Sequence, residues 1–125
     1  MASRTAALKL AAYAFATIFT GFGLNAFLRP GHALTFFEFS PPATAADRRM
    51  VDSLMYVYGA RNVFMGVAIY AAAMTGTKRS LAVTLLAAGG VAFVDGAACF
   101  AHGQGHWNHW GYAPVITAVG ALLLY

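Results

Sequence analysis

Four long apolar segments limit the folds that this sequence can adopt. They run over about residues 10–28, 51–74, 81–101 and 108–125. A helix needs roughly 20 apolar residues to cross the hydrocarbon core of a bilayer, and it satisfies its own backbone hydrogen bonds there. With 60% hydrophobic and 10% charged residues in a chain of 125, a soluble fold would leave much apolar surface in water. The sequence therefore predicts one all-α domain over residues 1–125, an integral membrane four-helix bundle of up-down topology.

Local signals mark the ends of these segments. Arg29 and Pro30 close the first one, because the residue before a proline avoids the helical region. Thr44 and Asp47 have the spacing of a capping box, which predicts that the second helix begins there. Gly76 suits the C-terminal cap of that helix.

The first segment also has a second interpretation. A basic start followed by an apolar run is typical of a secretory signal peptide, although the run is long and no small-x-small cleavage site follows it. The single cysteine, Cys99, allows no internal disulfide, so cysteine pairing gives no indication of the compartment.

Basic residues lie at the ends of the apolar segments, and their distribution predicts the orientation of the chain. Positive charge favours the cytosolic side of a membrane. The side with both termini has one basic residue more than the opposite side, so we expect both termini in the cytosol. The basic residues form no stripe with interleaved aromatic residues, so the expected partner is the lipid bilayer and not a nucleic acid. The two sides carry Arg4, Lys9, Lys78 and Arg79 against Arg29, Arg48 and Arg49.

Three polar residues fall inside the predicted spans, namely Asn25, Arg61 and Asp95. A charge at this depth costs roughly 2.5–3.5 kcal/mol on insertion scales, so such side chains face the bundle interior and find partners. Arg61 lies about ten residues into its span and Asp95 about six residues into its own, both counted from the side of the first and third loops, opposite both termini. The depths of the two residues therefore differ by roughly 6 Å at 1.5 Å per residue. We expect these two side chains to pair, and a bidentate pair would offset part of their desolvation. The alternative is a pair that only fixes helix packing.

The predicted helices are joined by a first loop (31–49), a second loop (75–77) and a third loop (102–112). Further polar residues gather in one half of the predicted bundle, beneath the first and third loops. Cys99 and His102 follow Asp95 on one helical stripe, and Tyr58 lies one turn before Arg61. The half beneath the second loop is almost wholly apolar, and this asymmetry predicts a site in the polar half. The predicted catalytic residues are Asp95, Arg61, His102 and Tyr58, and the predicted ligand-binding residues are Asn25, Cys99, His106 and His109.

The histidines of the third loop raise the question of a metal. His102, His106 and His109 have the spacing of one helix face, and three imidazoles with a water suit zinc. Gly103 and Gly105 argue against an unbroken helix, and the loop holds no acidic residue. We therefore predict no metal and no cofactor.

The run from Tyr58 to Asn62, followed by Gly66, resembles a stretch of a small four-helix membrane family of unknown function that is found largely in fungi. The resemblance extends through Asp95-Gly96 and His106-Trp107 to the end of the chain. DoxX-like four-helix membrane proteins look like more distant relatives. The resemblance implies a four-helix bundle with Arg61 and Asp95 as characteristic positions, and some members look like parts of secondary-metabolite pathways. The long histidine-rich loop departs from the family pattern.

These features favour a small intramembrane enzyme or binder for a lipophilic molecule. Arg61 would hold an oxygen of the ligand, Asp95 would act as general acid or base, and His102 and Tyr58 would relay protons. Isomerisation, cyclisation, hydration and cofactor-free oxygenation suit such residues. The alternatives are a non-catalytic accessory or scaffold subunit of a membrane complex, and a small transporter. The sequence leaves open whether the protein is an enzyme and whether it forms a homo-oligomer.

Overall fold

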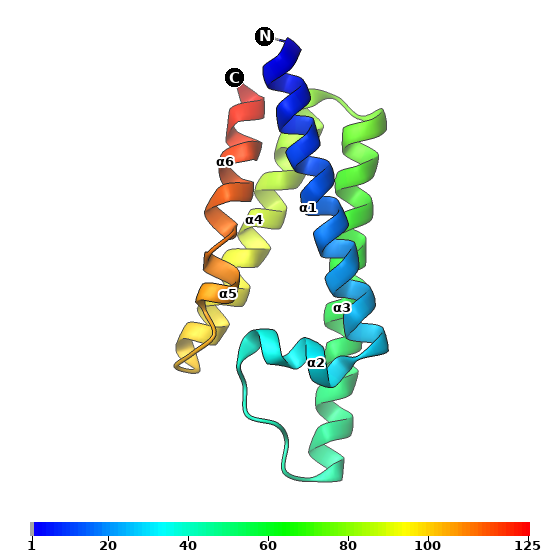
Figure 1. Cartoon of the computed structure of the whole chain (residues 1–125), viewed down its shortest axis with the longest axis vertical. Helices are drawn as coiled ribbons and strands as arrows, with labels where there is room; N and C mark the ends of the chain where they lie inside the picture. The colour runs from blue at the N-terminus through cyan, green and yellow to red at the C-terminus, as the bar shows by residue number, and fades with distance from the viewer. Residues whose placement is uncertain (1) are drawn as a thin grey trace.

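A computed structural model describes residues 2–125, and in this range the chain is all-helical without a strand. Four of the helices are long enough to build the body of the molecule, and the others lie in the connections (Figure 1). The elements are α1 (Ala2–Leu28), α2 (Pro30–Leu34), the 3₁₀-helix η1 (Thr35–Phe37), α3 (Ala45–Thr75), α4 (Lys78–Ala101), α5 (Trp107–Trp110) and α6 (Ala113–Leu124).

The long helices pack as two close pairs. Helix α1 lies along α3, and α4 lies along α6, whereas α3 and α4 touch over a shorter stretch. Both ends of the chain lie at one end of the molecule, together with the turn between α3 and α4 (Figure 1). The chain from α2 to the start of α3 and the turn before α5 lie toward the opposite end. This arrangement leaves a seam between the two pairs.

The helix ends follow the capping chemistry in the sequence. The backbone N–H of Asp47 donates to Thr44 Oγ1 at 3.1 Å, which confirms that Thr44 caps α3. Gly76 is the C-cap of α3, and its N–H donates to the Ala72 carbonyl at 3.1 Å. Thr77 then caps α4 in the same way as Thr44 caps α3.

Glycine allows α1 and α3 to approach closely. A Cβ at Gly23 would lie 2.6 Å from the Gly59 carbonyl oxygen, and a Cβ at Gly59 would lie 2.8 Å from the Gly23 carbonyl oxygen. No side chain fits between these two backbones, so small residues at both positions hold the pair together.

The last apolar segment is not one continuous helix, as the predicted span 108–125 would require. It consists of α5 and α6, separated by Gly111 and Tyr112. Pro114 lies in the first turn of α6, where its missing N–H and fixed φ are tolerated. The Trp110 indole N–H donates to the Phe93 carbonyl of α4 at 3.0 Å, which fixes α5 against α4.

Two helices of the described chain are long and apolar enough to cross a membrane. They are the Ser3–Leu28 part of α1 and the whole of α4, Lys78–Ala101. Buried apolar residues form a larger cluster among the four long helices and a smaller one where the α2–η1 segment packs against α3 and α4.

Candidate functional site

Arg61 of α3 and Asp95 of α4 form a bidentate ion pair. Arg61 Nη1 donates to Asp95 Oδ1 at 2.9 Å, and Arg61 Nη2 donates to Asp95 Oδ2 at 2.8 Å. The Asp95 side chain is 11% exposed and the Arg61 side chain 36%. The predicted pairing is confirmed, since the long arginine side chain spans the difference in depth between the two residues.

Two more residues of α3 surround the guanidinium group. Its carbon lies 4.8 Å from the centroid of the Tyr58 ring, which makes a cation–π contact. Asn62 is 2% exposed, and its Oδ1 accepts a hydrogen bond of 3.4 Å from Arg61 Nη2. Arg61 Nε is buried and has no hydrogen-bond partner among residues 2–125. A buried donor without a partner costs about 1–3 kcal/mol, so an acceptor supplied by a ligand would be favourable here.

An apolar cleft opens beside Arg61 in the seam between α3 and α4. Its volume is about 230 Å³. Apart from Arg61 and Thr84 its lining is apolar, and it includes Phe64, Ala68 and Ala87. The alanine side chains are too short to fill the space between the two helices. Phe64 is 71% exposed, so the cleft reaches the outer surface of the molecule.

The other predicted ligand-binding residues of the helices lie apart from this cleft. The Asn25 side-chain amide is 3.0 Å from His32 Nδ1, and this hydrogen bond ties the end of α1 to α2. Cys99 is fully buried in the smaller apolar cluster, with Phe37 and Met55. The structure therefore brings Tyr58, Arg61 and Asp95 together, but it does not bring Asn25 to them.

The three histidines of the third loop have separate surroundings. The His102 ring lies at the exposed end of α4, 4.4 Å from the Phe39 ring centroid. The His106 ring packs among the rings of Phe100, Trp107 and Trp110. His109 is buried against Phe37, and neither of its ring nitrogens has a hydrogen-bond partner in the described chain. No three His, Cys, Asp or Glu side chains among residues 2–125 lie close enough together to hold a metal ion.

The first and third loops are joined directly to each other. The Asn108 side-chain amide donates to the Phe36 carbonyl at 2.9 Å and to Glu38 Oε2 at 3.0 Å. Gly105 has a φ of +86°, and a Cβ there would overlap the Phe37 carbonyl, so glycine is required for this approach. The first loop, with Phe36 and Phe37, thus folds back on the bundle.

Sequence reasoning missed two features of the site. Asn62 contacts the guanidinium group and is buried, and its position next to Arg61 in the Tyr58–Asn62 run was a usable signal. The cleft itself left no such signal, because Phe64, Ala68 and Ala87 are ordinary residues for an apolar helix. One polar contact also lies in the other half of the bundle, between the hydroxyl groups of Thr17 and Tyr70.

These features define the class of protein: an all-helical protein with two helices of membrane-spanning length, and with a partly buried arginine–aspartate pair beside an apolar cleft. A family model described as a domain of unknown function (DUF4267) matches residues 16–123, so the chain belongs to that family. This confirms the expected membership of an uncharacterised family, whereas the fungal distribution and the relation to DoxX-like proteins stay predictions. No curated protein and no solved structure matches the chain.

Proposed function

We propose that the protein is a multi-pass membrane protein that binds a lipophilic molecule in the cleft between α3 and α4. The observation that carries this proposal is the cleft itself, a mostly apolar space of about 230 Å³ that Arg61 lines. Drug-sized ligands occupy roughly 300–1,000 Å³, so the cleft suits one ring or one chain of a larger molecule. The rest of such a molecule would extend past Phe64 into lipid.

The apolar outer surface supports several membrane crossings. Large apolar side chains are exposed on each of the four long helices, and soluble monomers rarely expose continuous apolar patches of that extent. Helices α5 and α6 together supply residues 107–124, about 27 Å of helix at 1.5 Å per residue. The exposed side chains include Leu10 and Leu24 on α1, Val57 and Phe64 on α3, Val83 and Val94 on α4, and Val115 and Leu122 on α6.

The charges at the site favour a neutral oxygen on the ligand. The Asp95 carboxylate already neutralises the Arg61 guanidinium through two hydrogen bonds, so no net charge attracts an anion. The buried Nε–H of Arg61 still lacks an acceptor. A carbonyl, hydroxyl or ether oxygen would fill this position without bringing a further charge into a water-poor site.

A catalytic version of this proposal uses the same residues. An oxygen held by Arg61 becomes more polarised, and this acidifies a C–H bond on the neighbouring carbon. Asp95 would take that proton and return it at another carbon, which is an isomerisation that needs no cofactor. Asp95 does not line the cleft, so catalysis would require the ion pair to open, and binding is the simpler function.

A second candidate function is an accessory subunit of a membrane complex. The observation in its favour is that Asp95 is only 11% exposed and has both oxygens paired with Arg61. A carboxylate that is fully paired in this way fits a contact that only fixes the packing of α3 against α4. The outer apolar surface would then contact a partner protein as well as lipid.

Extraction of bound molecules tests the leading proposal. The full chain is purified in a mild detergent, and its bound lipophilic molecules are identified by mass spectrometry. Ala87→Phe fills the cleft, and Arg61→Lys keeps a charge opposite Asp95 but removes the Nε–H. Ala98→Phe is the matched control, because Ala98 is exposed on the same helix and does not line the cleft.

We expect the wild type and Ala98→Phe to retain one common lipophilic molecule that carries a neutral oxygen. Ala87→Phe and Arg61→Lys should lose it while their thermal unfolding stays cooperative. Identical profiles of bound molecules in all four proteins would refute the cleft as a binding site and would favour the accessory subunit.

A further inference from the structure

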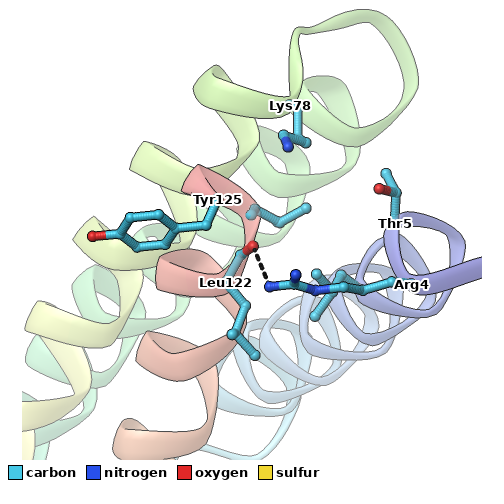
Figure 2. Close-up of a pocket in the computed structure, with 7 residues that line it drawn as sticks. Arg4, Thr5, Lys78, Leu122 and Tyr125 are labelled. Atoms are coloured by element: carbon cyan, nitrogen blue, oxygen red, sulfur yellow. Dashed lines mark hydrogen bonds between the residues drawn. The ribbon is translucent and has the colours of Figure 1, made fainter. Parts of the chain in front are cut away.

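A second cavity lies at the opposite end of the molecule from the Arg61–Asp95 pair. It has a volume of about 310 Å³ and lies where α1, α6 and the start of α4 meet. Arg4 and Lys78 line it together with Thr5, and Leu8 and Leu123 form its apolar wall. Figure 2 shows Arg4 and Lys78 reaching toward the same space from different helices. Cationic groups at the rim and leucines within give the cavity an amphipathic lining.

Arg4 and Lys78 both have hydrogen-bond donors without a partner in the described chain. Arg4 Nη2 donates to the Leu122 carbonyl at 3.3 Å, which is its one side-chain hydrogen bond in the described chain (Figure 2). A guanidinium group carries five N–H donors, so most of them remain available. Lys78 has no side-chain hydrogen bond or ion pair to any residue of the range 2–125.

The charged side chains around the cavity are all of one sign, and Tyr125 at the end of the sequence lines the cavity as well. Arg4, Lys9, Lys78 and Arg79 lie at this end of the molecule, and no Asp or Glu side chain accompanies them. The acidic residues lie elsewhere, at Glu38, Asp47, Asp52 and Asp95.

The start of α4 adds to this positive potential. The first turn of α4 contains Lys78 and Arg79 and no acidic residue, although the N-terminus of a helix favours negative charge. A cluster of cations at a helix N-terminus is electrostatically unfavourable unless an anion lies nearby. The cavity is the place where such an anion can lie between Arg4 and Lys78.

We infer that this cavity binds the phosphate group of an anionic lipid. The phosphate would lie between Arg4 and Lys78, with Thr5 as a further donor, and the start of an acyl chain would lie against Leu8 and Leu123. Basic pockets between helices at the cytosolic surface of a membrane have this chemistry. The inference concerns a different end of the molecule from the cleft, so either site can fail without the other.

A thermal-shift experiment on the full chain in nonionic detergent tests the site. Phosphatidylglycerol is added to one sample, phosphatidylcholine with the same acyl chains to a second, and inorganic phosphate to a third. The test variant is Arg4→Gln with Lys78→Gln. The matched control is Arg29→Gln with Arg49→Gln, which removes two exposed cations from the other end of the molecule.

We expect phosphatidylglycerol to raise the melting temperature of the wild type and of the control, as ligand binding to the native state does. Binding should weaken about 30-fold in the test variant, about fivefold for each charge removed. Salt at 1 M should weaken binding to the wild type, and this result does not depend on how well the variant folds. Stabilisation by inorganic phosphate as well, lost in the same variant, would also support the site and would assign the recognition to the phosphate group alone.

Two results would overturn the inference. One is equal stabilisation of the wild type by phosphatidylcholine and by phosphatidylglycerol. The other is equal binding of phosphatidylglycerol by the wild type and the Arg4/Lys78 variant, with no effect of salt.

Discussion

Among individual residues, Arg61 and Asp95 form the one salt bridge between side chains of residues 2–125. Each charge alone would be costly between apolar helices, and the bidentate geometry of 2.9 and 2.8 Å makes their pairing favourable. Removal of one partner alone is destabilising, because it leaves the other charge without a counter-ion between apolar helices. The contribution of the Arg61–Asp95 pair to the free energy of unfolding can therefore be measured separately from its contribution to ligand binding.

A double-mutant cycle measures the interaction. Arg61→Met or Asp95→Asn should each lower the free energy of unfolding by about 3 kcal/mol, the lower end of the range for breaking a buried pair, because Arg61 is partly exposed. The double variant should be more stable than the sum of the two losses predicts, because it leaves no unpaired charge. Unfolding in detergent is followed by circular dichroism, and strictly additive losses would contradict a coupled pair.

The sequence predicted the part of the site in which one buried charge had one residue of opposite charge within reach. Arg61 and Asp95 could be paired because a membrane span tolerates neither residue alone, and Tyr58 followed from helical spacing. Asn25 could not be placed, because its partner His32 lies beyond a break in the helix that proline imposes. The separate surroundings of His102, His106 and His109 depend on the turn geometry of Gly103 and Gly105, which spacing alone does not specify.

At the scale of elements, helix starts were predictable and the inner structure of the last segment was not. Thr44 fixes the start of α3 by a hydrogen bond to a residue three positions away. Contacts between residues so close in the sequence can be predicted from the sequence. The break between α5 and α6 depends on distant contacts, above all on the Trp110 indole packed on α4. The two sides of this break differ in polarity, because α5 contains Asn108 and His109 whereas α6 is mostly apolar, but this difference does not show how α5 packs on α4.

Two glycines of α4 test this contact between elements. A Cβ at Gly96 would overlap the Trp110 indole, whereas a Cβ at Gly90 would meet nothing within 4 Å. Gly96→Ala should lower the free energy of unfolding by about 1–3 kcal/mol, as overpacking does. Gly90→Ala should raise it by about 0.5–1 kcal/mol, because alanine is the better helix former.

Thermal and chemical unfolding of both glycine variants gives the comparison. Near-ultraviolet circular dichroism adds a direct signal from the displaced indole of Trp110. Equal stability of the two variants would show that the α4–α5 contact contributes little to the fold.

At the scale of the whole molecule, charge and polarity are distributed unevenly along the long axis. The charged side chains at the end with both termini are Arg4, Lys9, Lys78 and Arg79, whereas the end with the first and third loops carries Arg29, Arg48 and Arg49 together with Glu38, Asp47 and Asp52. In a chain that crosses a bilayer, the excess of one basic residue favours the end with both termini as the cytosolic side. The proposed orientation places the termini in the cytosol and the first loop on the other side.

Cysteine labelling tests that orientation. In a Cys99→Ser background, Ser3→Cys and Ser40→Cys each introduce one thiol at an exposed position near opposite ends of the molecule. A membrane-impermeant maleimide added to intact cells should label Cys at position 40 and should label position 3 only after the membrane is opened. The wild type, with Cys99 buried, is the control, and labelling of both positions from one side would rule out this topology.

The joined loops also set an order of events during synthesis. The Phe36 carbonyl and Glu38 are made early, whereas their partner Asn108 emerges about 70 residues later. Until the third loop has been made, the first loop is held only by contacts with earlier parts of the chain, such as Phe36 on Phe22 of α1 and Phe37 on Tyr58 of α3. The joined loops are therefore completed last, and a chain halted before residue 108 would lack both hydrogen bonds of Asn108 and the contact of His109 with Phe37.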